Sequence, residues 1–178
     1  MKKVAIFGNA GGGKSTLARK LAEITHLSLY PIDTIKYLPG GEEISHDDYL
    51  HQHRLLLSQS EWIIDGFGDV TTAWERFAEA DTLIFIDLPL LTHAWWVSKR
   101  LFKGVFVKPE GWPENSPILA GSLKSYRVLW LCHQRLTPRY RQYVAESEPC
   151  KYVYHLKSAS KISLFLDAVQ QNHQQTST

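Results

Sequence analysis

The chain has 178 residues, of which 44% are hydrophobic and 21% are charged, so it can bury a core and is too apolar to be disordered. Two cysteines cannot build a disulfide framework, and no apolar stretch reaches the length needed to span a bilayer. The N-terminal apolar run is too short for a secretory signal. These features predict one domain over residues 1–178 that works in the cytoplasm, away from membranes.

The formal net charge of +2 conceals two regions of opposite sign. Residues 42–81 contain ten acidic and two basic residues, whereas residues 99–157 contain eleven basic and four acidic residues. The basic region is compatible with a polyanionic partner and equally with a solvated surface, and composition leaves both interpretations open.

Short apolar runs alternate with helix-like segments along the chain. The first and fourth runs are almost continuously apolar, as in parallel strands that are covered on both faces. Two of the helical segments begin with capping-box patterns, at Ser45 and at Thr72. This alternation favours an α/β fold with a mostly parallel sheet. The predicted strands are residues 3–7, 27–32, 62–64, 83–86 and 152–156; the predicted helices are residues 14–24, 45–59, 91–102 and 117–136, with one from residue 72 and one from about residue 158.

The stretch from about residue 103 to residue 117 interrupts this alternation. It contains three prolines and two glycines. Loops of this length without secondary structure of their own are often functional, so we predict that it is an active-site lid.

Residues 8–15 carry the most specific motif of the chain. They read G-N-A-G-G-G-K-S and match the phosphate-binding pattern G-x-x-x-x-G-K-[ST] at every fixed position, between a predicted strand and a predicted helix. Glycines let backbone N–H groups curl around a phosphate, while Lys14 and the helix N-terminus add positive charge. Ser15 is the expected Mg²⁺ ligand, and ATP and Mg²⁺ are the expected cofactors. The predicted cofactor-binding residues of this P-loop are Gly8, Asn9, Ala10, Gly11, Gly12, Gly13, Lys14, Ser15 and Thr16.

Two absences narrow the class of P-loop protein. No N-K-x-D run for reading guanine occurs, which argues against a GTPase. The fourth predicted strand ends in Asp87 followed by Leu88, so the second acid that activates water in motor-type ATPases is missing. The small size of the chain and its short proline-rich stretch favour a kinase that transfers the γ-phosphate of ATP to a small acceptor.

Several motifs resemble the adenylate kinases. Residues 62–67, W-I-I-D-G-F, are similar to the strand and turn that carry D-G-F in that family, and residues 81–89 are similar to its next strand. With Y-P-I-D at residues 30–33 and the basic run at 135–139, the chain most closely resembles the bacterial adenylate-kinase-like proteins known as DNA topology modulation, or FlaR-related, proteins. The resemblance implies a P-loop NTPase fold of nucleoside-monophosphate-kinase type: a five-stranded parallel sheet, helices on both faces and a short lid.

The chain departs from adenylate kinases beside the acceptor. The P-R that follows their D-G-F, with its phosphate-binding arginine, is replaced by Gly68 and Asp69. A carboxylate repels a phosphate, so AMP is not the expected acceptor. The acceptor is a nucleotide or another small compound with a hydroxyl or phosphate group, and the sequence leaves its identity open.

Two acids end predicted strands at the edge where open α/β sheets bind ligands. By resemblance to shikimate and gluconate kinases, Asp33 would orient or deprotonate the acceptor; the alternative is an acid that caps a turn. Asp65 would hold Mg²⁺ through water. The predicted metal ligands are therefore Ser15 and Asp65.

Basic residues complete the predicted site. Arg100 and Lys103 enter the predicted lid, and the resemblance implies that they contact the phosphates, with Arg100 closing over the transferred group. Arg127, Arg135 and Arg139 would share a helical face if Pro138 does not end the helix. That face could form a cationic groove; the alternative is an exposed face whose arginines form ion pairs. The expected catalytic residues are Lys14, Asp33 and Arg100, and the expected substrate-binding residues are Asp33, Arg54, Asp65, Arg127 and Arg135.

A second function stays open: a nucleotide-dependent, DNA-associated regulatory protein without kinase turnover. The basic region supports it, but no helix-turn-helix, zinc-finger or RNP signature occurs, so nucleic acid is not the favoured partner. The oligomeric state is not specified by any pattern. Trp95, Trp96 and Trp130 are expected in the core rather than on a base-stacking surface.

Overall fold

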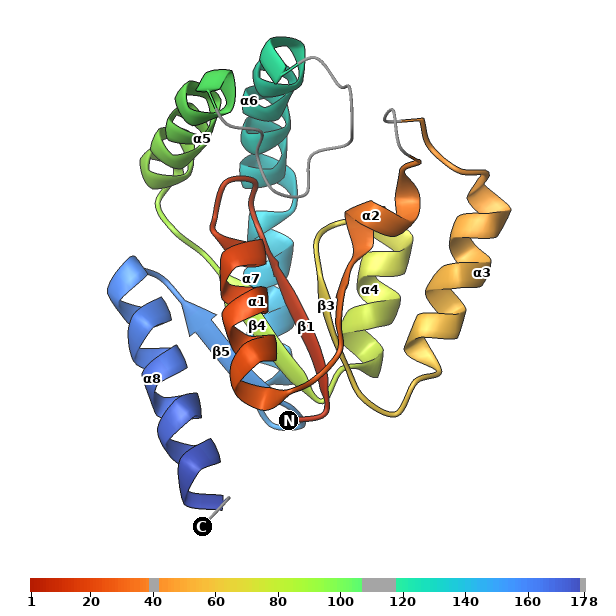
Figure 1. The fold of residues 1–178 in the computed structure, drawn as a ribbon, viewed down its shortest axis with the longest axis vertical. Coiled ribbons are helices and arrows are strands. Elements are labelled where there is room, and N and C mark those ends of the chain that lie inside the picture. Colours follow the sequence, from red (N-terminus) through yellow and green to blue (C-terminus); the bar gives the residue numbers. More distant parts are fainter. Residues whose placement is uncertain (39–41, 107–117, 177–178) are drawn as a thin grey trace.

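The structure, a computed structural model, describes residues 1–38, 42–106 and 118–176, and for residues 100–106, 118–125 and 176 it describes the backbone alone. Five parallel strands form one sheet in the order β2-β3-β1-β4-β5 (Figure 1). The strands are β1 (Lys3–Gly8), β2 (Leu29–Pro31), β3 (Trp62–Asp65), β4 (Thr82–Ile86) and β5 (Tyr152–Leu156). All five predicted strands are confirmed, and β2 is the shortest because the chain turns into a helix at Ile32.

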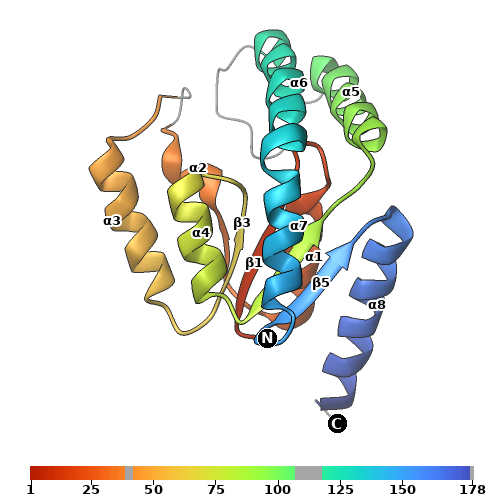
Figure 2. The same cartoon turned by 180° about the vertical axis from the view of Figure 1, so that it is seen from behind.

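Eight helices occur in the described part of the chain. One pair, α1 and α8, covers one face of the sheet, and α4 and α7 cover the other, with α3 beside α4 (Figures 1 and 2). Helices α5 and α6 pack against each other beyond the carboxyl ends of the strands. The helices are α1 (Lys14–Thr25), α2 (Ile32–Lys36), α3 (His46–Leu57), α4 (Val70–Glu79), α5 (Leu90–Phe106), α6 (Ile118–Arg135), α7 (Thr137–Ser147) and α8 (Ala159–Thr176).

Strand β1 shows why the sheet needs helices on both faces. Val4 and Ile6 point into the core under α1 and α8, whereas Ala5 and Phe7 point into the core under α4 and α7. All four side chains are at most 2% exposed. Burying an aromatic or aliphatic side chain of this kind contributes about 2 kcal/mol, so the continuous apolar run stabilises both layers.

Two predicted helix starts have different outcomes. Ser45 caps α3 as predicted, because its hydroxyl oxygen accepts a hydrogen bond from the Asp48 N–H at 3.1 Å. The predicted start at Thr72 is wrong: α4 begins at Val70, and Asp69 caps it by accepting from the Thr72 N–H at 2.9 Å.

The basic helix predicted over residues 117–136 is followed by a break. Helix α6 ends at Arg135, and α7 begins at Thr137 with Pro138 in its first turn, where the missing N–H is harmless. Arg139 therefore lies on a different helix from Arg127 and Arg135, and the continuous three-arginine face does not form.

Two further expectations change around α5. This helix continues to Phe106, so Lys103 is helical and the predicted lid cannot start before residue 107; residues 107–117 lie outside the described part of the chain. Trp95 and Trp130 are 67% and 53% exposed, so the expectation that both are core residues is wrong. None of the described helices combines the length and the hydropathy that crossing a membrane requires.

Candidate functional site

The P-loop joins the end of β1 to the start of α1 at the carboxyl edge of the sheet. Gly8, Gly11 and Gly13 adopt φ angles of 140°, 68° and 77°, which residues with a Cβ rarely reach. Gly13 is the N-cap of α1 and offers no side chain to the first turn, which also contains no acid. The backbone N–H groups of this turn are thus left for an anion, as the motif predicts.

Lys14 bends back over the loop. Its Nζ donates a hydrogen bond to the Asn9 carbonyl oxygen at 2.9 Å. The next two residues, Ser15 and Thr16, are exposed in the first turn of α1. The structure therefore places the Lys14 cation against the loop and the two hydroxyl groups in the first turn of α1.

Asp65 lies beside the P-loop strand, because β3 pairs with β1 and places Asp65 opposite Ile6. Its side chain is buried, and burial raises the pKa of the carboxyl group; the Lys14 charge and a hydrogen bond from Ser15 oppose this shift only in part. Its Oδ1 atom has no hydrogen-bond partner among the described residues. Asp65 is thus a buried carboxylate next to the P-loop cation.

Asp33 reaches the same place from the first turn of α2. It is exposed, and its Oδ2 lies 3.3 Å from the position that a Cβ on Gly66 would take. Its charge also contributes to the raised pKa of Asp65. The two acids predicted from strand ends are therefore neighbours, and Gly66, with φ of 109°, makes room for the second.

A buried arginine supports the turn that follows β3. Arg76, on α4, is 1% exposed, and its Nη2 donates to the carbonyl oxygens of Gly66 at 3.2 Å and Phe67 at 2.7 Å. Burial lowers the pKa of the guanidinium. The sequence analysis did not predict a role for Arg76, because a lone arginine on an amphipathic helix is normally a surface residue. Its position next to Phe77, on the apolar face of α4, was the signal that could have indicated burial.

The other predicted site residues make no described hydrogen bond to the P-loop or lie outside the described side chains. Arg54 is exposed on α3, and Arg127 and Arg135 are exposed on α6, with no described hydrogen bond or ion pair to the P-loop or the two acids. The side chains of Arg100 and Lys103, on α5, lie outside the described residues.

The carboxylate of Asp87, directly after β4, makes hydrogen bonds to other side chains of the protein. Arg141 donates two hydrogen bonds to its carboxylate, at 2.7 and 2.9 Å, and His155 Nε2 lies 2.9 Å from Oδ2. Although burial opposes ionisation, these contacts hold the pKa of Asp87 below its ordinary range. Arg141 and His155 were not among the predicted site residues.

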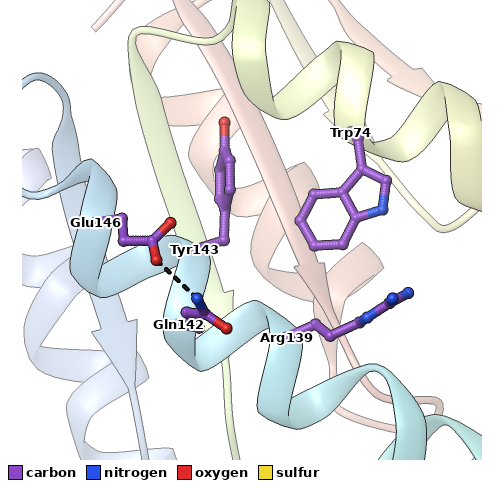
Figure 3. A pocket seen from close by; sticks show the side chains of 5 residues that line it. All are labelled: Trp74, Arg139, Gln142, Tyr143 and Glu146. Carbon is purple, nitrogen blue, oxygen red and sulfur yellow. Dashed lines mark hydrogen bonds between the residues drawn. The ribbon is translucent and has the colours of Figure 1, made fainter.

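A pocket of about 300 Å³ lies between α4 and α7, on the face of the sheet away from α1 (Figure 3). Trp74 projects from α4, and the other lining residues come from α7, where Gln142 donates to Glu146 at 2.8 Å. It contains no P-loop residue, and Arg139, one of the three arginines predicted to share a helical face, lines it. The lining residues are Trp74, Arg139, Gln142, Tyr143 and Glu146.

The described residues contain no group of three or more histidine, cysteine or acidic side chains arranged to hold a metal ion alone. Ser15 and Asp65 together offer a hydroxyl and a carboxylate. Such a pair is suited to an ion that takes its remaining ligands from a bound phosphate and from water.

No protein-family model matches the chain, and no curated protein sequence matches it. Among solved structures, shikimate kinase from Acinetobacter baumannii in complex with shikimate is similar, with a TM-score of 0.58 and 15% identity over 97% of this chain and 93% of that chain. An unliganded sugar kinase from Janibacter sp. has a TM-score of 0.47 and 16% identity over 97% of this chain and 91% of that chain. The fold is the predicted one: an α/β P-loop fold of nucleoside-monophosphate-kinase type, with the strand order 2-3-1-4-5.

Proposed function

We propose that this protein is an ATP-dependent phosphotransferase that acts on a small, hydroxyl-bearing acceptor. The observation that carries the proposal is one edge of the sheet, where a complete P-loop adjoins two neighbouring carboxylates, Asp33 and Asp65. The P-loop is an anion site, and the carboxylates supply oxygens for a metal ion and for an acceptor hydroxyl. The likeness of the fold to a small-molecule kinase is in keeping with this class of reaction.

ATP is proposed to bind through its phosphates. The N–H groups of residues 8–15 and the N-terminus of α1 surround the β- and γ-phosphates, with Thr16 at the rim. Lys14 exchanges the Asn9 carbonyl for the phosphate oxygens. Arg100 and Lys103 are proposed to offset the charge that shifts during transfer, as the family resemblance implies.

Ser15 and Asp65 are the proposed Mg²⁺ ligands, directly or through water. The residues fit this ion, because Mg²⁺ prefers oxygen ligands and in nucleotide sites takes only one or two carboxylates besides phosphate and water. The unpartnered Oδ1 of Asp65 is an available oxygen. When bound, Mg²⁺ neutralises phosphate charge.

In the proposed reaction, the acceptor hydroxyl oxygen bonds to the γ-phosphorus while the bond from that phosphorus to the bridging oxygen breaks. ADP leaves with that electron pair, and Asp33 accepts the hydroxyl proton. Asp33 is exposed, so an acceptor can reach it. Most of the rate then comes from positioning and charge stabilisation.

The acceptor is proposed to be small and weakly charged. Asp33 and Asp65 already repel an anion, and Asp69 is fixed as the cap of α4 where adenylate kinases carry a phosphate-binding arginine. Arg54, Arg127 and Arg135 remain the proposed acceptor contacts, on α3 and α6. Within the P-loop kinases, the motifs at residues 30–33 and 62–67 favour a relationship of this chain to the DNA topology modulation proteins.

The test is ADP formation from Mg·ATP with a panel of nucleosides, sugars and hydroxy acids, in wild type and in Lys14→Ala. The proposal expects at least one acceptor to raise ADP formation far above the variant. Equal rates in both proteins with every acceptor would contradict it.

The alternative is a DNA-associated protein without turnover, and the exposed arginines Arg127 and Arg135 on α6 are its main support. A mobility shift with duplex DNA separates it from the kinase. Binding that vanishes by about 0.15 M salt is general polyanion attraction; sequence-specific binding that persists and depends on ATP would favour the alternative.

A further inference from the structure

Helix α5 packs against the P-loop. His93 is 1% exposed, and its Nδ1 lies 2.9 Å from the Ala10 carbonyl oxygen. A carbonyl oxygen only accepts hydrogen bonds, so Nδ1 carries the proton and donates it. Burial, followed by the charge of Lys14, lowers the pKa of His93 to about 4, so the imidazole is neutral at physiological pH.

One stripe of α5 contacts three consecutive P-loop glycines. A Cβ on Gly12 would lie 2.9 Å from the His93 ring, and one on Gly11 would lie 2.6 Å from the Val97 side chain. A Cβ on Gly13 would lie 3.1 Å from the ring of Trp96. The P-loop pattern itself requires only Gly8 and Gly13. The close approach of α5 explains why Gly11 and Gly12 are also glycines, since a Cβ at either position would collide with α5.

The contact with Ala10 also fixes the direction of a backbone N–H group. The described chain contains no cis peptide bond, and in a trans peptide the carbonyl and the N–H of the next residue point to opposite sides. When His93 holds the Ala10 carbonyl toward α5, the Gly11 N–H is directed away from α5. In a P-loop, N–H groups at these positions receive the phosphate.

We propose that His93 is a positioning residue for phosphate binding: through the Ala10 carbonyl, its imidazole fixes the peptide plane that aims the Gly11 N–H at the phosphates of ATP. This inference rests on the proposed function, because it assigns a role within the same ATP site. Asn9 assists, since its Nδ2 donates to the Leu129 carbonyl of α6 at 3.0 Å and its Oδ1 accepts from the Ala10 N–H at 2.8 Å.

The experiment measures binding of Mg²⁺ with the non-hydrolysable analogue adenylyl imidodiphosphate by calorimetry. His93→Leu fills the space without a donor, and His93→Asn keeps an N–H near the place of Nδ1. The inference expects His93→Leu to bind about tenfold more weakly than wild type and His93→Asn to recover most of the loss. Leu91→Ala, a change at an 83% exposed position on the same helix, is the matched control and should bind as wild type does.

A merely structural role would lower the thermal midpoint of both His93 variants without separating their affinities, and that result would overturn the inference. If His93→Leu does not fold, Gly12→Ala gives a second measurement. Its Cβ meets the imidazole, so it should weaken binding more in wild type than in His93→Asn, and equal losses would overturn the inference. Absence of binding to wild type would instead refute the proposed function.

Discussion

The P-loop region and the α3–α4 region both contain side-chain nitrogens that are shielded from solvent, but the two regions differ in whether these nitrogens are hydrogen-bonded. Around the P-loop, the side chains of Asn9, Lys14 and His93 all hydrogen-bond to backbone carbonyl oxygens. Between α3 and α4, both ring nitrogens of His53 and the Nη1 atom of Arg76 make no hydrogen bond among the described residues, although His53 Nδ1 lies 3.5 Å from a carboxylate oxygen of Glu75. Side-chain nitrogens therefore fix the backbone of the P-loop, whereas the α3–α4 region keeps buried nitrogens without hydrogen bonds; beside the P-loop, the Oδ1 atom of Asp65 is the unpartnered group.

The largest expected difference between the regions is in turnover. Lys14→Ala removes the cation of the phosphate site, and we expect ATP-dependent turnover to fall by at least about a hundredfold. Lys14 makes one described hydrogen bond, to the Asn9 carbonyl oxygen, so the thermal midpoint should change by no more than the loss of that bond. Turnover above about a tenth of the wild-type rate would mean that the P-loop does not serve this reaction.

Acid should destabilise both regions. The pKa of His53 is lowered from 6.5 to about 4 by burial and by Arg76, and that of His93 by burial and by Lys14. As the pH falls below 6.5, the unfolded chain gains protons that the folded chain does not bind, so stability declines toward pH 4. The expected loss between pH 7 and pH 5 is about 2 kcal/mol for each histidine, measured by urea unfolding.

The variant His53→Leu isolates the contribution of the α3–α4 region. It removes one titrating group, whose nitrogens make no described hydrogen bond and whose Nδ1 lies 3.5 Å from the Glu75 carboxylate, so the pH-dependent loss should shrink by about half. His51→Ala, an exposed change on the same helix, should leave the loss as in wild type. An unchanged loss in His53→Leu would show that His53 does not drive the acid sensitivity.

The third prediction concerns Arg76, which should matter for the turn after β3 and not for the P-loop. Arg76→Met leaves the Gly66 and Phe67 carbonyls without their donor and should lower the free energy of unfolding by about 2 kcal/mol. Binding of Mg²⁺ with the ATP analogue should stay within about threefold of wild type, because the contacts of the P-loop are unaltered. Loss of ATP binding in a folded Arg76→Met variant would contradict the claim that Arg76 does not act on the P-loop.

The smallest expected change in stability is at Asp65, where the two regions meet. Its raised pKa means that the buried carboxylate is unfavourable when ionised at neutral pH. Asp65→Asn should therefore raise the free energy of unfolding while it abolishes the Mg²⁺ dependence of ATP binding. Lower stability together with unchanged Mg²⁺ dependence would contradict both parts of this assignment.

The sequence predicts local features of this molecule better than distant contacts. The P-loop is a contiguous motif, and the five strands have strong apolar runs, so both are readable from neighbouring residues. The role of His93 depends on a contact 83 residues away in the chain, and that of Arg76 on two carbonyls across a turn. No local pattern encodes such contacts.

Errors in the prediction have the same origin. Thr72 and Asp69 are both good caps, and only the path of the chain after β3 decides that Asp69 begins α4. The composition of α5 shows that it is apolar but not that Trp95 faces outward. The break between α6 and α7 was the exception, since Pro138 signalled it in advance.

The most direct test of the account is to follow phosphorus itself. Wild-type protein, Mg·ATP and each candidate acceptor are examined by ³¹P nuclear magnetic resonance, with Lys14→Ala in parallel. The account predicts ADP and a new phosphate-ester signal in equal amounts for at least one acceptor with wild type, and neither signal with the variant. Release of inorganic phosphate alone, or no consumption of ATP with any acceptor, would contradict it.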